Sequence, residues 1–236
     1  LLMFLRKHIQ DFFQVQTSTV SLAERSISIA GGFVGILFVM MISSAFIGST
    51  SVVFVVASMG ASAVLLFAAP HSTFSQPWPL LGRHLVSALI GVACAKFIPD
   101  PLFAAAFAVA VAIGAMHFLK CIHPPGGATA LVAVIGGDAI QSVGFEFVLY
   151  PVLINALIIL TVAVVFNFPF SWRKYPASRI HTPTAPQNPE DAYSDITHAE
   201  FVVALSKIDS VIDVSEHDLI QIYDLVTKSK LERESL

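Results

Sequence analysis

A long region with almost no charge constrains the fold of this chain more than any other sequence feature. Between residues 27 and 169 the charged residues are Arg83, Lys96, Asp100, Lys120, Asp138 and Glu146. Residues 171–236, by contrast, contain eighteen charged residues. The charged share of the whole chain, 12%, is about half of what soluble globular proteins show. We therefore expect an all-α membrane protein with a small soluble tail, and we exclude nucleic-acid-binding, disordered and disulfide-stapled classes.

Six apolar segments are candidates for membrane spans. A helix needs about 20 apolar residues to cross the hydrocarbon core. The segments are residues 27–48, 51–70, 84–99, 101–119, 124–137 and 145–168. The fifth segment has only 14 residues, which cover about 21 Å as a helix. We predict six spans, of which the fifth is short.

Basic residues on both sides of this region predict its orientation. They are Arg6, Lys7, Arg25, Arg173, Lys174 and Arg179. By the positive-inside rule both termini are cytoplasmic, or on the equivalent side of an organelle membrane, so the number of spans is even. Six spans place Arg83 and Lys120 in inner loops, and Asp100 and Asp138 in outer loops.

The segments outside the membrane domain differ in composition. Residues 1–26 include an amphipathic stretch, 2–13, that is expected to lie on the membrane surface. The transmembrane domain covers residues 27–170, and a proline-rich linker covers residues 171–192. Residues 193–236 are predicted to form a soluble helical tail, with capping patterns that indicate a hairpin of two helices.

Two short segments resemble each other at a spacing of 67 residues. Gly-Ala-Ser-Ala begins at Gly60, and Gly-Ala-Thr-Ala begins at Gly127. Two halves of three spans each would have opposite orientations, which gives a 3+3 inverted repeat with short or broken spans two and five. The alternative is that both segments are small-residue faces for helix packing.

The most specific stretch is residues 121–131, Cys-Ile-His-Pro-Pro-Gly-Gly-Ala-Thr-Ala-Leu. Prolines suit a first helical turn, so His123 is expected just before a helix N-terminus. Unpaired N–H groups and the helix dipole make such a terminus an anion site. Residues 60–62 are predicted to begin an opposed half-helix, because residues 52–56 are β-branched enough to be non-helical. The candidate anion-binding residues are therefore His123, Pro124, Pro125, Gly126, Gly127, Ala128, Thr129, Gly60, Ala61 and Ser62.

Several other polar residues are candidates for more specific roles. Arg83 and Lys120 are candidate residues at the mouth of a pathway, or else topology anchors. His123 is a candidate carrier of a coupled proton. Asn155 is a candidate for hydrogen bonding between helices. No catalytic residue, metal site or cofactor is predicted, and the chain is not expected to be an enzyme.

The stretch at 121–131 resembles the signature of the HPP family of membrane proteins. Residues 60–70 with Gln76-Pro77 resemble a second shared block, and Asn167 with Tyr175-Pro176 resembles the C-terminal edge. The resemblance covers about residues 25–176. Cyanobacterial and plastid members are similar to nitrite transporters, which implies anion transport here and a location in a bacterial inner membrane or a plastid envelope.

These observations predict transport of a small inorganic anion, most specifically nitrite. The expected partners are that anion, the lipid bilayer and a second copy of the chain in a homodimer, with no nucleic acid. An alternative is a membrane scaffold or sensor that signals through its helical tail.

Overall fold

The described part of the chain is entirely helical, as predicted. The structure, a computed structural model, describes residues 21–46 and 49–177. In chain order the elements are α2 (Leu22–Phe46), α3 (Ser49–Ala68), the 3₁₀ turn η1 (Thr73–Ser75), α4 (Pro77–Phe97), α5 (Pro101–Phe118), α6 (Gly126–Ile135), α7 (Asp138–Val143), the π-helical turn η2 (Val148–Leu153) and α8 (Ile154–Asn167). The amphipathic stretch 2–13, the proline-rich segment 182–189 and the helical tail lie outside these residues.

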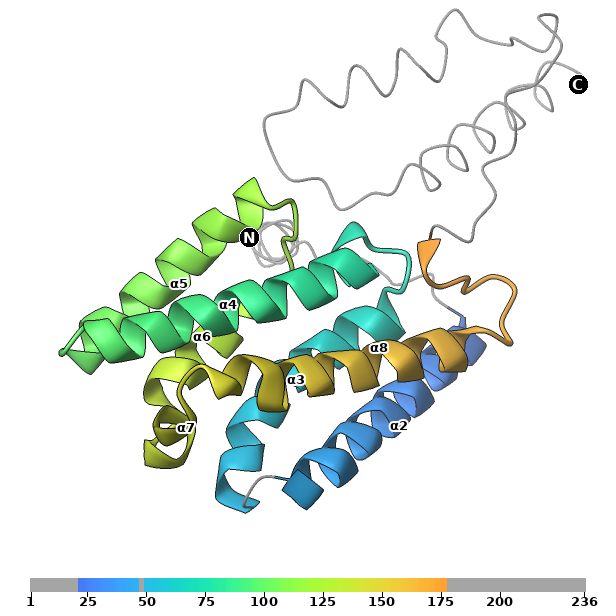
Figure 1. Cartoon of the computed structure of the whole chain (residues 1–236). Coiled ribbons are helices and arrows are strands. Elements are labelled where there is room, and N and C mark those ends of the chain that lie inside the picture. The colour runs from blue at the N-terminus through green and yellow to red at the C-terminus, as the bar shows by residue number, and fades with distance from the viewer. Residues whose placement is uncertain (1–20, 47–48, 178–236) are drawn as a thin grey trace, which may run out of the picture.

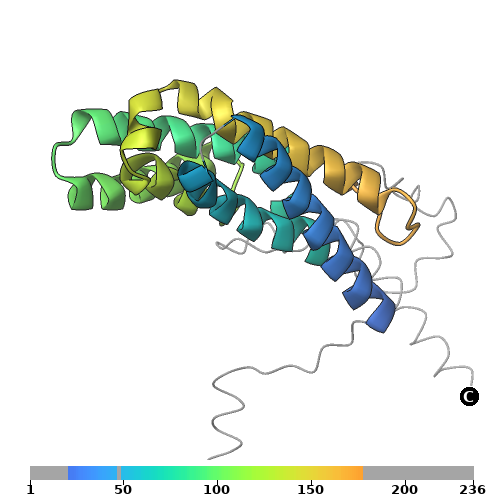
Figure 2. The same cartoon turned by 90° about the horizontal axis from the view of Figure 1, so that it is seen from below.

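The helices form two groups that share contacts (Figure 1). In one group α2 packs against α3 and α8, and in the other α4, α5 and α6 pack against one another. Contacts of α4 with η2 and of α3 with α6 join the groups. Figure 2 shows α2 and α8 lying across each other on one side and α4 and α5 extending to the other. α6 thus contacts both α3 and α4.

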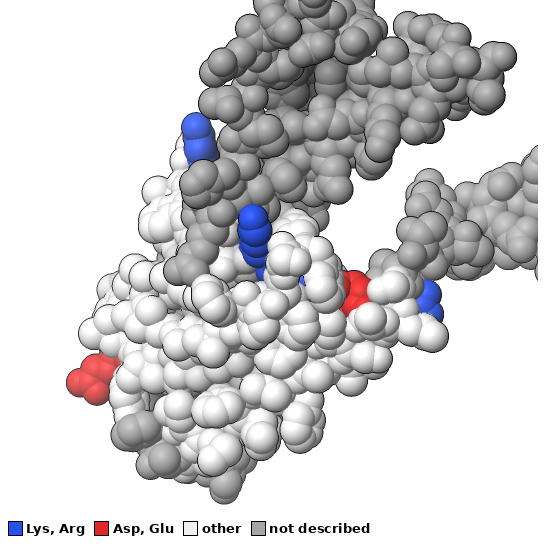
Figure 3. All heavy atoms as spheres, turned by 90° about the vertical axis from the view of Figure 1, so that its right-hand side faces the viewer, with Lys and Arg blue, Asp and Glu red and all other residues white. Residues whose placement is uncertain are grey.

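Within residues 21–46 and 49–177, four helices are long and apolar enough to cross a membrane. They are Leu22–Ser44, Pro77–Phe97, Pro101–Phe118 and Val148–Asn167. Two shorter apolar helical segments lie between them in sequence: Ala57–Ala68, which is the second part of α3, and Gly126–Ile135, which is α6. The space-filling view in Figure 3 shows a broad uncharged surface with only a few charged side chains. The chain is an integral membrane protein, while the six-span count and the inverted repeat stay predictions.

The start of α4 corrects the predicted third span. That span was expected to begin at His84, but α4 begins at Pro77, seven residues earlier. Pro77 stands at the first helical position, where its missing N–H costs nothing. Arg83 consequently lies inside a membrane helix rather than in an inner loop, and His84 lies in the second turn of that helix rather than at its start. By contrast, α5 begins at Pro101 as predicted, where the Asp100 carboxylate accepts a hydrogen bond of 2.8 Å from the N–H of Phe103.

A second correction concerns α3. Residues 52–56 are helical, and α3 continues without a break from Ser49 to Ala68. The prediction that Gly60, Ala61 and Ser62 begin an opposed half-helix is therefore wrong, because they lie in the helix interior. β-Branched residues lower helix propensity only slightly. In a bilayer the backbone must satisfy its own hydrogen bonds, and this requirement outweighs that preference.

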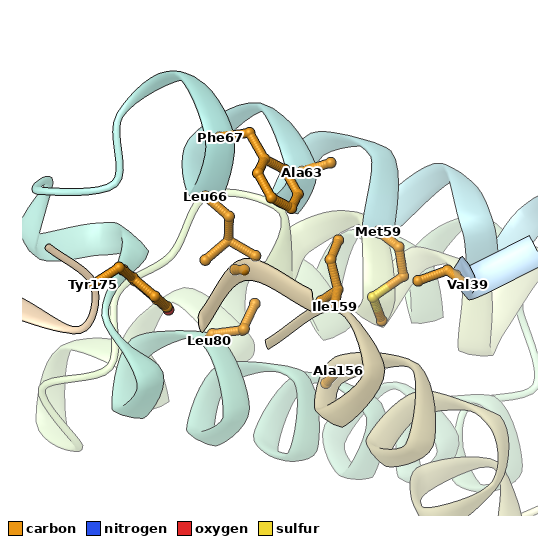
Figure 4. Packing of buried hydrophobic residues seen from close by; sticks show 10 residues of the cluster. Val39, Met59, Ala63, Leu66, Phe67, Leu80, Ala156, Ile159 and Tyr175 are labelled. Carbon is orange, nitrogen blue, oxygen red and sulfur yellow. The ribbon is translucent and has the colours of Figure 1, made fainter. Parts of the chain in front are cut away.

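The main apolar core lies where α2, α3, α4 and α8 meet (Figure 4). Met59 and Leu66 of α3, Leu80 of α4 and Ile159 of α8 are fully buried there. Tyr175, which follows α8, is also part of this core. The core holds the polar face of α3 in a fixed position beside the first turns of α4.

Candidate functional site

A buried guanidinium lies at the centre of the polar residues in the bundle. Arg83 is in the second turn of α4, and none of its surface is exposed. Its Nη2 donates a hydrogen bond of 3.0 Å to Oγ of Ser62 on α3 and another to Nε2 of His84. Its Nε and Nη1 atoms have no hydrogen-bond partner within the part of the chain that the structure describes. Arg83 thus keeps unused donors in the interior of a membrane protein.

The ring of His84 connects the two segments that resemble each other in sequence. Because Nε2 of His84 accepts from Arg83, we assign the ring proton to Nδ1. Nδ1 then donates to Oγ1 of Thr129 over 3.0 Å. Oγ of Ser62 lies 3.3 Å from Nε2 of the same ring. Ser62 and Thr129, which occupy matching positions in the two segments, therefore meet at His84.

His123 closes the cluster on its other side. It is fully buried, and its Nδ1 donates to the carbonyl of Phe74 over 2.5 Å. A carbonyl can only accept, so the neutral ring carries its proton on Nδ1 and presents Nε2 as an acceptor. That Nε2 lies 3.2 Å from Oγ of Ser62. His123 consequently links the turn η1 to the residues around Arg83.

No carboxylate neutralises Arg83 among the residues described. The ion pair found in this part of the chain joins Arg173 to Glu24 instead. A guanidinium has five N–H donors, and the two hydrogen bonds of Nη2 leave three of them on Nε and Nη1. Burying an unpaired charge costs a great deal of free energy. The site is therefore chemically suited to an anion.

The two glycines that follow the His-Pro-Pro stretch, Gly126 and Gly127, differ in how closely other residues pack against them. The helix α6 begins at Gly126 with Pro125 at its N-cap, two residues after the predicted start at Pro124. A Cβ atom on Gly126 would lie 2.6 Å from Cγ and 2.7 Å from Cδ of Arg83. A Cβ atom on Gly127 would meet only Val109, at an ordinary 3.7 Å. Gly126 is thus the residue that lets the start of α6 approach Arg83.

The structure brings together some of the predicted site residues and not others. Ser62, His123, Gly126 and Thr129 surround Arg83 and His84. Ala61 and Pro124 are exposed, and Gly60, Gly127 and Ala128 are partly exposed. Lys120 is exposed in the turn after α5. The prediction that Arg83 lies at a mouth is wrong, since the side chain is in the interior.

Sequence reasoning missed His84 completely. The signal was the Gln-Pro-Trp-Pro stretch at residues 76–79, which indicates a helix start there. A helix from Pro77 would have placed both Arg83 and His84 in the membrane, where ionisable side chains mark functional sites.

A pocket of about 270 Å³ lies between α5 and α6 beside the cluster. Its lining residues are Val109, Ile113, Met116, His117, Ile122, His123, Pro124 and Gly127. Most of this lining is apolar. The pocket reaches His123, the residue that joins η1 to the centre of the site.

A second polar cluster ties together the helix ends on the side where α2 begins. Arg173 pairs with Glu24, and it donates to the carbonyl of Phe67 over 2.5 Å and to Oδ1 of Asn167 over 2.9 Å. The indole of Trp172 donates to the same Glu24 carboxylate over 2.9 Å. These bonds join the start of α2 to the ends of α3 and α8.

The chain after Arg173 also contacts η1. The hydroxyl of Tyr175 donates to the carbonyl of Ser75 over 2.7 Å, and burial raises the pKa of this phenol. The N–H of Ala177 donates to Oε1 of Gln76 over 2.9 Å. Gln76, Asn167 and Tyr175, which contributed to the family resemblance, therefore hold the segment after α8 in place.

Comparison with known proteins agrees with this architecture. A transmembrane protein of Dictyostelium discoideum is 39% identical over 148 residues, which are 61% of this chain and 47% of the relative. A second transmembrane protein of that organism is 37% identical over 148 residues, or 61% of this chain and 52% of the relative. The chain thus spans about half the length of the curated relatives it matches.

No solved structure gives a significant match. The family model described as the transmembrane region of HPP proteins matches residues 17–176, which include every residue of the cluster around Arg83. The chain therefore belongs to the HPP transmembrane family.

Proposed function

We propose that this protein transports a small inorganic anion across the membrane, with nitrite as the first candidate. The observation that supports the proposal most strongly is the guanidinium of Arg83, which is fully buried, has no carboxylate partner in the described part of the chain, and retains unused donors on Nε and Nη1. Ionisable groups buried in membrane domains usually mark a substrate or ion pathway.

The chemistry of the cluster favours an anion over a cation. The unused groups of Arg83 are all N–H donors on a positive charge, and a cation would be repelled by that charge. A single uncompensated guanidinium matches one negative charge, so a monovalent anion leaves the smallest net charge in the interior. Nitrite meets this requirement, and the family resemblance is the reason to test it before nitrate, formate or chloride.

The test is nitrite uptake into proteoliposomes at mildly alkaline pH, where little neutral nitrous acid is present to cross the lipid unaided. Wild-type protein is compared with Arg83→Gln and with Lys96→Gln, which removes a positive charge near the far end of the same helix. We expect saturable uptake by wild type and Lys96→Gln, and none above empty liposomes by Arg83→Gln. Equal uptake by all three proteins would reject a site at Arg83.

A second candidate is a sensor or scaffold that signals through the tail. It is favoured by the contacts of Tyr175 with Ser75 and of Ala177 with Gln76, because Phe74 in the same turn accepts a hydrogen bond from His123. The turn η1 thus touches both the site and the chain that leads into residues 178–236. Deleting residues 190–236 distinguishes the two candidates: a transporter retains nitrite uptake, whereas a scaffold loses its output and shows no uptake before or after the deletion.

A further inference from the structure

Two other buried polar groups have no partner in the part of the chain that the structure describes. The hydroxyl of Ser87 on α4 is fully buried, and Asn155 on α8 is 1% exposed. Neither Oγ of Ser87 nor Nδ2 of Asn155 has a hydrogen bond. In a membrane domain each such group is costly unless it faces water or a ligand. Apolar packing therefore does not explain why Ser87 and Asn155 are polar.

Their positions continue from Arg83 toward the opposite side of the membrane. Ser87 is four residues after Arg83, so the two lie one above the other on the same face of α4. Asn155 is the second residue of α8, and α8 packs against α4. Oδ1 of Asn155 accepts a hydrogen bond of 2.7 Å from Ser43, near the end of α2. Figure 1 shows that the end of α2 and the start of α8 lie on the side away from the start of α4.

Both residues have unused hydrogen-bond donors. A serine in a helix ordinarily donates to a carbonyl of the preceding turn, but Ser87 does not, so its O–H remains available. The acceptor oxygen of Asn155 is occupied by Ser43, and its two amide N–H groups remain. The free amide donors of Asn155 favour an anion, and the positive charge of Arg83 on the same side of α4 disfavours a cation.

From this arrangement we infer that Ser87 and Asn155 line the path of the anion between Arg83 and the membrane face at which α2 ends. The inference rests on the proposed function and adds two pathway residues to it. Arg83 binds the anion, and Ser87 and then Asn155 replace part of its hydration shell as it moves through the bundle. Both residues contact the anion in transit and so set the rate at which it crosses the membrane.

The contrasting view is that Asn155 only joins α2 to α8 through Ser43. Two variants separate these roles. Ser43→Ala removes the contact between the helices and leaves the amide donors of Asn155 in place. Asn155→Asp replaces the amide donors with a negative charge that repels an anion, and keeps an oxygen for Ser43 to donate to.

The experiment measures two quantities for each purified protein: the rise in unfolding temperature with added nitrite, which reports binding, and the maximal rate of nitrite uptake into proteoliposomes. Thr161→Val is the matched control, because Thr161 is exposed on the same helix and its hydroxyl donates only to the carbonyl of Leu157. Ser87→Ala tests the second donor.

We expect Asn155→Asp to lower the maximal uptake rate at least about tenfold, and Ser87→Ala about threefold, while nitrite still stabilises both proteins at wild-type concentrations. Ser43→Ala and Thr161→Val should transport at nearly the wild-type rate. Unchanged uptake by Asn155→Asp would overturn the inference alone, as would a loss in Ser43→Ala equal to that in Asn155→Asp. Wild-type protein that neither binds nor takes up nitrite would overturn the proposed function and this inference with it.

Discussion

Nη2 of Arg83 lies 3.0 Å from Oγ of Ser62, although the two residues belong to different helices and are 21 positions apart in the chain. This contact places the positive charge of α4 against the polar face of α3. The contact satisfies one edge of the guanidinium, while Nε and Nη1 have no partner among the described residues.

The two adjacent glycines at the start of α6 provide a test of this geometry. In Gly126→Ala the new methyl group would lie less than 3.0 Å from Arg83 and from Sδ of Met116. We expect the displaced guanidinium to lower nitrite uptake by about tenfold or more, which corresponds to about 1.4 kcal/mol. Gly127→Ala is the matched control, since its methyl group finds ordinary contact. Equal uptake by the two variants would show that the position of Arg83 does not matter.

The two hydroxyl groups around His84 are expected to differ in importance. Ser62 contacts Arg83, His84 and His123, whereas the side chain of Thr129 contacts His84. Ser62→Ala should weaken nitrite binding by about 2 kcal/mol and Thr129→Val by about 1 kcal/mol, because more buried groups lose a partner in the first variant. Titrations of nitrite-dependent stabilisation measure both. The reverse order would argue against the central place of Ser62.

The Arg173–Glu24 pair should contribute to stability rather than to anion binding. Glu24→Gln leaves the buried Arg173 without its carboxylate. We expect the free energy of unfolding in detergent to fall by about 2 kcal/mol, as it does when one partner of a largely buried pair is removed. Lys174→Gln, which changes an exposed neighbour, is the control. A Glu24→Gln protein as stable as this control would show that the pair is not structural.

Part of this structure follows from local sequence signals. Proline at a helix start predicted the beginning of α5 at Pro101, because proline is tolerated only in a first turn or outside a helix. It predicted a start at Pro124 for α6, which begins two residues later, at Gly126. The same signal was available at Pro77, but the charge of Arg83 favoured a loop there. A cation at the edge of an apolar segment is normally a topology marker, and only the packing of α3 against α4 shows that this one is internal.

The repeat between residues 60–65 and 127–132 gave a mixed outcome. Ser62 and Thr129, which the repeat places at equivalent positions, both lie within hydrogen-bond distance of the ring of His84. The repeat also suggested that Gly60 begins a helix, which is wrong because α3 is continuous. The two similar segments carry a hydroxyl residue at the same position, but that position is in the interior of α3 in one segment and near the start of α6 in the other. No local pattern indicates that His84 lies between them, because that contact depends on three helices.

The most direct test of the central claim is the effect of nitrite on the unfolding temperature of the purified protein, with gluconate as the control anion. The account predicts that nitrite raises the unfolding temperature of wild type and of Lys96→Gln in a saturable manner, and has no such effect on Arg83→Gln. An equal, saturable rise in Arg83→Gln would contradict the claim that the guanidinium of Arg83 binds the anion.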